Sequence, residues 1–371
     1  MIPVNTPLLE GNEKKYLAEC IDTGWISSEG PFIKKFEDSF TNRLGRKHAI
    51  ALSNGSAALE VAFTAIGIKS GDEVILPTFT IISCISPLIR IGAIPIFVDV
   101  DIQNWNMEVD KIKSKISSKT KAILVVHIYG LPVDLDPIIK LAKEKNLYII
   151  EDAAEMIGQK YKGKECGTFG DISTFSFYPN KHITTGEGGM ILTDDDYLAS
   201  KSRELINLSF TPPRRFVHYE LGWNYRITNM QAALGLAQFE QLDKNILKKR
   251  QIGAWYDKYL KGIMGVSLPI KETEYAKNIY WVYGILINKE HRLSAIDVME
   301  RLLKKGIGTR PFFYPLHIQP VFSEMNFYKD KSFPNSEYLS EKGFYLPSGL
   351  GVSEEEVKAV SIELKKIFNN E

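Results

Sequence analysis

Short, almost continuously apolar runs recur through the middle of the chain and alternate with segments of helical periodicity. The runs are EVILP (73–77), IPIFVDV (94–100), KAILVVHIYG (121–130), LYIIEDAA (147–154), ISTFSFY (172–178) and GGMILTD (188–194). Between two of them lie residues 134–145, whose apolar side chains follow helical spacing. Strands that are apolar on both faces and alternate with helices predict an α/β fold with a mainly parallel sheet flanked by helices.

The same patterns predict two domains. The strand-rich region, followed by a long helical stretch at about 229–260, places a large domain over residues 1–245. The first 30 or so residues could pack with either domain. A smaller α+β domain over residues 246–371 is predicted from a strand-like run at 280–287, a helix around 294–305 and a last helix from about 353.

Charge and cysteine usage exclude several kinds of protein. The chain has 46 basic and 45 acidic side chains, which argues against a nucleic-acid-binding surface or a membrane-binding patch. Cys20, Cys84 and Cys166 are far apart and odd in number, so we expect neither a disulfide framework nor a metal site. The N-terminus lacks a signal-peptide pattern and no apolar run approaches about 20 residues, so we expect a cytoplasmic protein.

The segment FSFYPNKHITTGEGGM, residues 175–190, carries the strongest chemical signal. Lys181 follows a strand and precedes a glycine-rich turn at 186–189. A lysine that forms a Schiff base must be neutral when it attacks a carbonyl, and a partly desolvated pocket favours that state by lowering its pKa. Nearby glycines let the backbone approach a cofactor. On this spacing alone, a solvated loop lysine is the commoner case.

A second signal is ALSNGSAALEVAF, residues 51–63, where a strand ends at Asn54 and a helix begins. Ser56 can cap this helix, and the first backbone N–H groups of a helix form a site suited to a phosphate. An ordinary helix cap without a ligand is the alternative.

The third signal is Asp152 in IIEDAAEMIG, residues 149–158. We expect it at the carboxyl end of a buried parallel strand, where open α/β sheets bind ligands. An acid in an apolar setting needs a partner, and a protonated pyridine nitrogen is a suitable one because the ion pair keeps the ring an electron sink. Capping of the next helix by Asp152 is the alternative. Together with Ser56 and Lys181, Asp152 completes a phosphate cradle, a pyridinium partner and a Schiff-base lysine.

A wider set of segments carries a family resemblance. They are TGWISSEGPFIKKFE (23–37), SNGSAAL (53–59), GDEVILPTFT (71–80), GAIPIFVDVD (92–101), HIYG (127–130), IEDAAE (150–155), GTFGDISTFSFYPNKHITTGEGGM (167–190) and NYRITNMQAALGLAQ (224–238). In them the chain resembles the sugar aminotransferases of the DegT/DnrJ/EryC1/StrS group, within the fold type I aminotransferases. The resemblance covers almost the whole chain and is greatest to the GDP-perosamine synthase branch.

The resemblance implies a cofactor, partners and residue roles. The cofactor is pyridoxal 5'-phosphate, the amino donor L-glutamate and the acceptor a nucleotide-linked keto-sugar, in a homodimer with shared active sites. Lys181 would carry the cofactor and move protons, Asp152 would pair with the pyridine nitrogen, and Glu155 would lie near the ring hydroxyl. The phosphate would be held by Gly55, Ser56 and Ser176 and, from the neighbouring subunit, by Asn224. Substrate contacts are expected from Arg310, Tyr314, His317 and His182.

Some choices stay open. Many relatives have Trp or Tyr where this chain has Ile81, so either Phe79 or Ile81 would cover the cofactor ring. Relatives that act as sugar dehydratases replace the Schiff-base lysine with histidine, so the retained Lys181 favours transamination. A non-catalytic protein on the same fold is a third hypothesis. GDP-4-keto-6-deoxymannose is the favoured acceptor, and a UDP-linked keto-sugar or an octulosonate aldehyde is the alternative.

Other polar and aromatic residues have ordinary structural interpretations. We expect His127 to be structural, Cys166 to pack in the core, and the aromatic cluster at 280–283 to lie in a core strand. The pair Arg214-Arg215 follows two prolines and either clamps a diphosphate or lies in a solvated loop.

Overall fold

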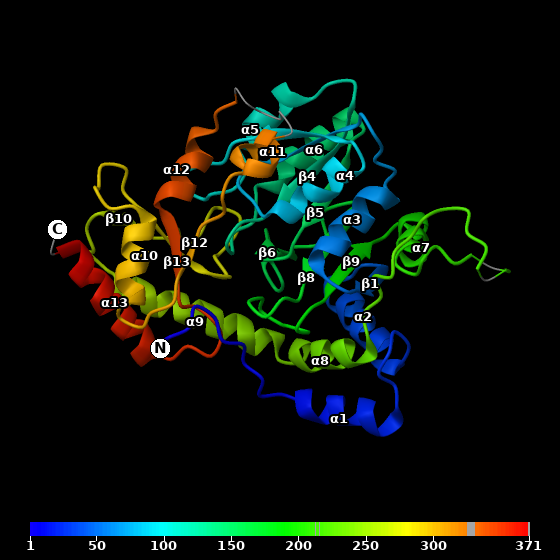
Figure 1. The fold of residues 1–371 in the computed structure, drawn as a ribbon, viewed down its shortest axis with the longest axis horizontal. Helices are drawn as coiled ribbons and strands as arrows, with labels where there is room; N and C mark the ends of the chain where they lie inside the picture. The colour runs from blue at the N-terminus through cyan, green and yellow to red at the C-terminus, as the bar shows by residue number, and fades with distance from the viewer. Residues whose placement is uncertain (212, 215, 325–330, 370–371) are drawn as a thin grey trace.

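The computed structural model describes residues 1–371 apart from 212, 215, 325–330 and 370–371. Its elements form a large sheet with helices on both faces and a smaller sheet beside it (Figure 1). Helices α8 (Asn229–Phe239) and α9 (Leu242–Tyr259) follow one another along one side of the molecule and join the two parts.

Seven strands make up the large sheet, in the order β1-β9-β8-β5-β4-β2-β3. Their bounds are β1 His48–Leu52, β2 Glu73–Pro77, β3 Ile94–Val98, β4 Thr120–Val126, β5 Tyr148–Asp152, β8 Ile172–Ser176 and β9 Gly189–Thr193. Strand β9 is antiparallel to both of its neighbours, whereas the pairs from β8 through to β3 are parallel. The predicted α/β fold with a mainly parallel sheet is therefore confirmed.

Alternate side chains of the strands contribute to two cores, one on each face of the sheet. In β4, Leu124 lies in the core that includes side chains of α3, α4 and α7, and Ile123 lies in the core that includes α2, α6 and α8. Because both faces are covered, both must be apolar, which explains the continuous apolar runs. The covering helices have the bounds α2 Pro31–Leu44, α3 Gly55–Ala65, α4 Ser86–Arg90, α6 Leu135–Lys145 and α7 Asp196–Leu205.

The smaller sheet is antiparallel, in the order β10-β11-β13-β12. Its elements are β10 Val266–Ser267, β11 Tyr283–Ile287, β12 Arg310–Pro311 and β13 Gly343–Leu346, with helices α10 Ala295–Leu303 and α13 Glu354–Asn369. Side chains from this sheet, α9, α10 and α13 form a third core. The N-terminus joins this part, because Ile2 pairs with Ile307 and the Ser348 N–H donates to the Val4 carbonyl.

Short elements complete the fold. They are α1 Glu13–Thr23, η1 Ile82–Cys84, α5 Val109–Ile112, η2 Lys113–Lys115, the hairpin of β6 Lys160–Tyr161 and β7 Lys164–Glu165, η3 Leu316–Ile318, α11 Pro320–Glu324 and α12 Pro334–Lys342. Helix α1 packs on α8, so the first 23 residues contact both parts of the molecule. No helix in the described ranges has both the length and the apolarity required to cross a membrane.

Two expected elements differ from those observed. The stretch at 229–260 is interrupted at Glu240 and Gln241, between α8 and α9. The strand expected at 280–287 begins only at Tyr283, because Tyr280 has a φ of 53°, a left-handed conformation that a strand does not contain.

Candidate active site

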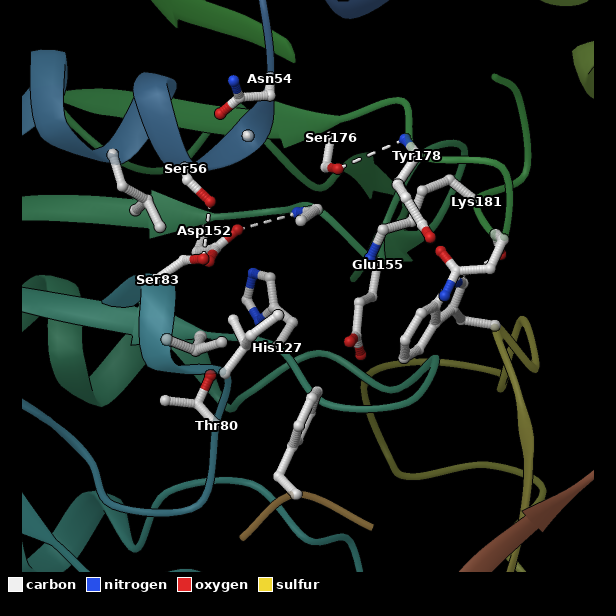
Figure 2. Close-up of a pocket in the computed structure, with 18 of the residues that line it drawn as sticks. Asn54, Ser56, Thr80, Ser83, His127, Asp152, Glu155, Ser176, Tyr178 and Lys181 are labelled. Carbon is white, nitrogen blue, oxygen red and sulfur yellow. Dashed lines mark hydrogen bonds between the residues drawn. The ribbon is translucent and has the colours of Figure 1, made fainter. Parts of the chain in front are cut away.

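A cavity of about 620 Å³ opens at the carboxyl ends of the parallel strands (Figure 2). The start of α3 and the ends of β5 and β8 supply its polar part. The fold brings together here six of the residues expected to bind the cofactor: Gly55, Ser56, Asp152, Glu155, Ser176 and Lys181. They come from separate strands and loops, and the parallel topology places their ends at one edge of the sheet.

The first turn of α3 forms one wall of the cavity. Asn54 caps this helix, because its Oδ1 accepts a hydrogen bond from the Ala57 N–H at 2.8 Å. The expectation that Ser56 is the cap is therefore wrong; the Ser56 hydroxyl instead hydrogen-bonds the Ser83 hydroxyl at 2.7 Å. The N–H groups of Gly55 and Ser56 belong to the first turn of the helix. N–H groups there have no acceptor within the helix, so they are suited to binding an anion.

Asp152 ends β5 inside the cavity and is 4% exposed. Its Oδ1 accepts a hydrogen bond from the Ala154 N–H at 3.1 Å, and its Oδ2 lies 3.5 Å from the Cys84 thiol. Burial raises the pKa of Asp152, while the Ala154 N–H and the charge of Lys181 act in the opposite direction. Within the described residues, no basic side chain forms a salt bridge with Asp152. A cationic ring nitrogen, as expected from the sequence, would suit this buried carboxylate.

The ring of His127 makes two hydrogen bonds, one of them to the same strand. Its Nδ1 accepts from the Val133 N–H at 3.0 Å, so its Nε2 carries the proton and donates to Glu151 at 3.2 Å. Burial opposes ionisation of Glu151, but the His127 contact and the N–H groups of Gly167 and Phe169 outweigh it and lower the pKa of that carboxyl. The expected structural role of His127 agrees with these contacts, although its ring also lines the cavity.

Lys181 and Glu155 point into the same part of the cavity (Figure 2). Burial lowers the pKa of Lys181, and the carboxylates of Glu155 and Asp152 oppose that effect without cancelling it. Burial likewise raises the pKa of Glu155, whose Oε2 accepts a 2.6 Å hydrogen bond from the Tyr129 N–H. Both shifts favour neutral groups, and a neutral amine is the form that attacks a carbonyl.

Four aromatic side chains complete the lining: Tyr178, Trp281, Phe313 and Tyr345. The core strand expected at 280–283 is wrong for Trp281, which precedes β11 and places its ring 4.1 Å from Lys181 Nζ. No local spacing connects Trp281 or Tyr345 with Lys181, because they approach it only through the tertiary fold. The aromatic richness of residues 280–283 was the single available signal.

Ile81, and not Phe79, faces the cavity. Phe79 is fully buried and packs on Tyr129, Phe312 and Phe313, whereas Ile81 is 48% exposed and lines the cavity. Of the two candidates for covering the cofactor ring, only Ile81 lines the cavity where the cofactor is expected.

The remaining expected residues lie outside this chain's cavity. Asn224 is exposed, and its Oδ1 accepts hydrogen bonds from Arg226. His317 is 2% exposed, with Nδ1 2.8 Å from the Thr78 hydroxyl and Nε2 3.0 Å from Glu337 Oε1. The other expected substrate contacts, Arg310, Tyr314 and His182, do not line the cavity either.

His182 is fully buried beside α9, where the side chain of Asn245 donates a hydrogen bond to its carbonyl oxygen at 3.0 Å. Burial, followed by the charges of Lys249 and Lys181, lowers the pKa of His182 well below its usual range.

The arginine pair at 214–215 was expected either to clamp a diphosphate or to lie in a solvated loop. Arg214 is exposed, and Arg215 lies outside the described residues.

Comparison with known proteins gives full-length matches. The sequence model of the DegT/DnrJ/EryC1/StrS aminotransferase family matches residues 7–365. The chain is 44% identical to a GDP-perosamine synthase of Escherichia coli O157:H7 over 369 residues, covering 100% of this chain and 99% of that protein. It is 42% identical to a GDP-perosamine synthase of Vibrio cholerae, covering 100% of both chains. Among solved structures, the aminotransferase TlmJ from Streptoalloteichus hindustanus superposes with a TM-score of 0.92 at 28% identity, covering 99% of this chain and 98% of that one.

Proposed function

Because this chain belongs to the DegT/DnrJ/EryC1/StrS aminotransferase family, we propose that it transfers an amino group from L-glutamate to the 4-keto group of GDP-4-keto-6-deoxymannose. The enzyme is a pyridoxal-phosphate-dependent nucleotide-sugar aminotransferase of surface polysaccharide biosynthesis. The observation that carries the choice of sugar is the full-length similarity to two GDP-perosamine synthases, in a chain that keeps an amine at Lys181 in the cavity.

The cavity residues fit pyridoxal phosphate. The phosphate group would bind the first turn of α3 and the Ser176 hydroxyl, where N–H and O–H donors face an anion. Asp152 would hold the ring nitrogen in its protonated form, which supplies the cation that this buried carboxylate lacks. Glu155 would lie beside the ring hydroxyl, and Ile81 would cover one face of the ring.

Lys181 performs two tasks in this proposal. Its amine attaches the cofactor, and burial favours the neutral form that this attachment requires. During the reaction the freed amine takes up a proton at Nζ and returns it as an ammonium. When bound, pyridoxal phosphate supplies an electron sink next to the carbon that loses its proton.

We also propose a homodimer in which Asn224 reaches the phosphate site of the neighbouring subunit. The described residues between α7 and α8 extend away from the rest of the molecule (Figure 1). It carries Phe216, Tyr219 and Leu221, which are 75%, 87% and 89% exposed. Exposed apolar side chains in one segment are typical of an interface with another chain. We further propose a cytoplasmic location, supported by three free, buried cysteines.

Two alternatives differ in the product. A UDP-linked keto-sugar or an octulosonate aldehyde would give a different amino product by the same chemistry. A sugar dehydratase would instead release a deoxygenated keto-sugar, and the amine of Lys181 argues against it because such relatives have histidine there.

The test is a product screen by mass spectrometry. The purified enzyme, with isotopically labelled glutamate, is given a panel of GDP- and UDP-linked keto-sugars and an octulosonate aldehyde. We expect the label in an amino-sugar made fastest from the GDP-linked 4-keto-sugar, and no product with Lys181→Ala. Faster amination of a UDP-linked sugar would overturn the choice of substrate, and an unlabelled deoxygenated product would overturn the aminotransferase.

A further inference from the structure

The indole ring of Trp281 lies directly against the amine of Lys181. Lys181 Nζ is 4.1 Å from the centroid of the ring, well inside the range of about 6 Å over which a cation is attracted to an aromatic face. Trp281 is 4% exposed and Lys181 is partly buried at the edge of the cavity, so the tryptophan side of this contact is shielded from solvent. A desolvated cation–π contact is stronger than an exposed one.

Both ends of Trp281 are fixed by hydrogen bonds. Its indole N–H donates to the carbonyl oxygen of Asn180 at 2.8 Å, which is the residue immediately before Lys181. Its own carbonyl oxygen accepts a 2.6 Å hydrogen bond from Lys249 Nζ on α9. Lys249 is 2% exposed and also donates to the Ser348 carbonyl at 2.6 Å. The ring of Trp281 is thus held to the lysine loop, and its backbone is held to α9 by Lys249.

The backbone before Trp281 has an unusual conformation that sets the position of the ring. Tyr280 has a φ of 53°, and its N–H donates to Asn278 Oδ1 at 2.7 Å. A Cβ on Gly130 would lie 2.7 Å and 2.9 Å from the nitrogens of Tyr280 and Trp281, so only glycine allows this approach. Left-handed backbone at a bulky residue persists where the surrounding structure enforces it, and such residues cluster at functional sites.

We propose that Trp281 is a positioning residue for Lys181: its ring holds the protonated amine in place while that amine carries the proton between bond-breaking and bond-making steps. This inference rests on the proposed function, in which Lys181 Nζ gains one proton as an amine and gives it up as an ammonium. The ring fits this task because it attracts the ammonium without adding a charge. A carboxylate in the same place would bind the cation more strongly and would therefore disfavour the neutral amine to a greater extent.

The contact also accounts for how the amine can change its charge in a buried site. Burial lowers the pKa of Lys181, which favours attack but opposes proton storage. An aromatic face offsets part of that penalty. Its removal should therefore lower the pKa of Lys181 further, by about 0.5 to 1 pH unit for a contact of about 1 kcal/mol.

The test measures this titration in the full-length chain freed of cofactor. Lys181 is acylated with trace acetic anhydride across a pH series, and its labelled peptide is quantified by mass spectrometry. We expect the labelling midpoint to fall by about 0.5 to 1 unit in Trp281→Leu. Trp281→Phe loses the hydrogen bond to Asn180 but keeps an aromatic face. Because of that face, its midpoint should fall less than the midpoint of Trp281→Leu. The same order should appear in the acidic limb of the kcat profile of the holoenzyme, with KM for glutamate nearly unchanged.

Trp255 provides a matched control. Lys248 Nζ lies 4.6 Å from its ring centroid on α9, outside the cavity, so Trp255→Leu removes a similar lysine–tryptophan pair. That variant should leave the Lys181 midpoint unchanged. An unchanged midpoint in Trp281→Leu overturns the proposal. If the leucine variant does not fold, unchanged midpoints in both Trp281→Phe and Trp281→Met overturn it instead. Because labelling needs no turnover, this result is separate from any failure of the proposed reaction.

Discussion

Gly55 and Ser176 are packed so closely that a Cβ at position 55 would lie 2.8 Å from the Ser176 Cβ. Gly55 begins α3 and Ser176 ends β8, so a helix start and a strand end meet without a side chain between them. The gap between the first turn of α3 and the Ser176 hydroxyl is where the phosphate is proposed to bind. The absence of a Cβ at Gly55 is thus a condition for the shape of this site.

Gly55→Ala should weaken cofactor binding. The added methyl group must displace Ser176 or the first turn of α3, at a cost of about 1–3 kcal/mol typical of overpacking. We expect roughly a tenfold or larger rise in the Kd for pyridoxal phosphate, measured by fluorescence titration. Gly55→Ala combined with Ser176→Gly restores the space, so a double-mutant cycle should show a favourable coupling. Purely additive effects would contradict steric conflict as the cause.

The strands could be predicted from local signals, and so could Asp152, Lys181 and Ser56 as site residues. Glu155 and Ser176 were expected only from the family resemblance. Continuous apolar runs locate the strands of the large sheet, and the parallel topology then gathers residues at strand ends, such as Asp152 and Ser176. The choice between Asn54 and Ser56 as helix cap could not be made, because both types cap helices and only backbone geometry distinguishes them.

The aromatic half of the site could not be predicted, for a different reason. Trp281 lies just before β11 and Tyr345 lies in β13, and both line the cavity with Lys181. Nothing in their local sequence encodes that approach. His317 shows the converse: the family resemblance implied a substrate contact, but both of its ring nitrogens are engaged by Thr78 and Glu337.

Borohydride reduction of the holoenzyme should fix the cofactor on Lys181. The reason is that its amine lies in the cavity with Asp152 and Glu155, and burial lowers its pKa. Peptide mapping by mass spectrometry gives the labelled residue. Lys249 is an internal control, since it is a buried lysine that does not line the cavity and should stay unlabelled. Labelling of any lysine other than Lys181 would remove the assigned attachment site.

Asp152→Asn should keep the fold and bind cofactor but lose most turnover. An amide has nearly the same shape, but it cannot stabilise a protonated ring nitrogen, so the electron sink weakens. We expect kcat to fall roughly 100- to 1,000-fold, the usual effect of removing one electrostatic partner from a site. Stopped-flow measurement of the glutamate half-reaction tests this directly. Near-normal rates in a fully loaded variant would show that Asp152 has no such role.

Lys249 should make stability rise with pH. Burial lowers the pKa of Lys249 to about 7, whereas an unfolded chain has a lysine pKa of about 10.4. Between these values the unfolded state binds more protons, so the free energy of unfolding increases with pH, by at most about 1.4 kcal/mol per unit. Urea unfolding of wild type and Lys249→Met at several pH values measures the difference. Wild type should gain relative to the variant from about pH 7 to 10; an equal slope in both would mean that Lys249 stays charged when folded.

Asn224 gives the last prediction, because it tests sharing of sites between subunits. In one chain Asn224 is exposed and does not line the cavity, and its Oδ1 is engaged by Arg226, so a role in phosphate binding requires a second subunit. Homodimers of Lys181→Ala should be inactive, and those of Asn224→Ala should bind pyridoxal phosphate weakly. A heterodimer of the two has one site that lacks both residues and one that keeps both. Co-expression with two affinity tags, followed by sequential purification, isolates that heterodimer. We expect its activity to be near half of the wild-type value per dimer.

A control heterodimer pairs Lys181→Ala with Arg301→Ala, a change on α10 of the smaller part. This heterodimer should be half-active, and the Arg301→Ala homodimer should be fully active. The shared-site proposal fails if neither site of the Lys181→Ala and Asn224→Ala heterodimer binds cofactor more tightly than the Asn224→Ala homodimer does. In that case Asn224 serves its own subunit or none.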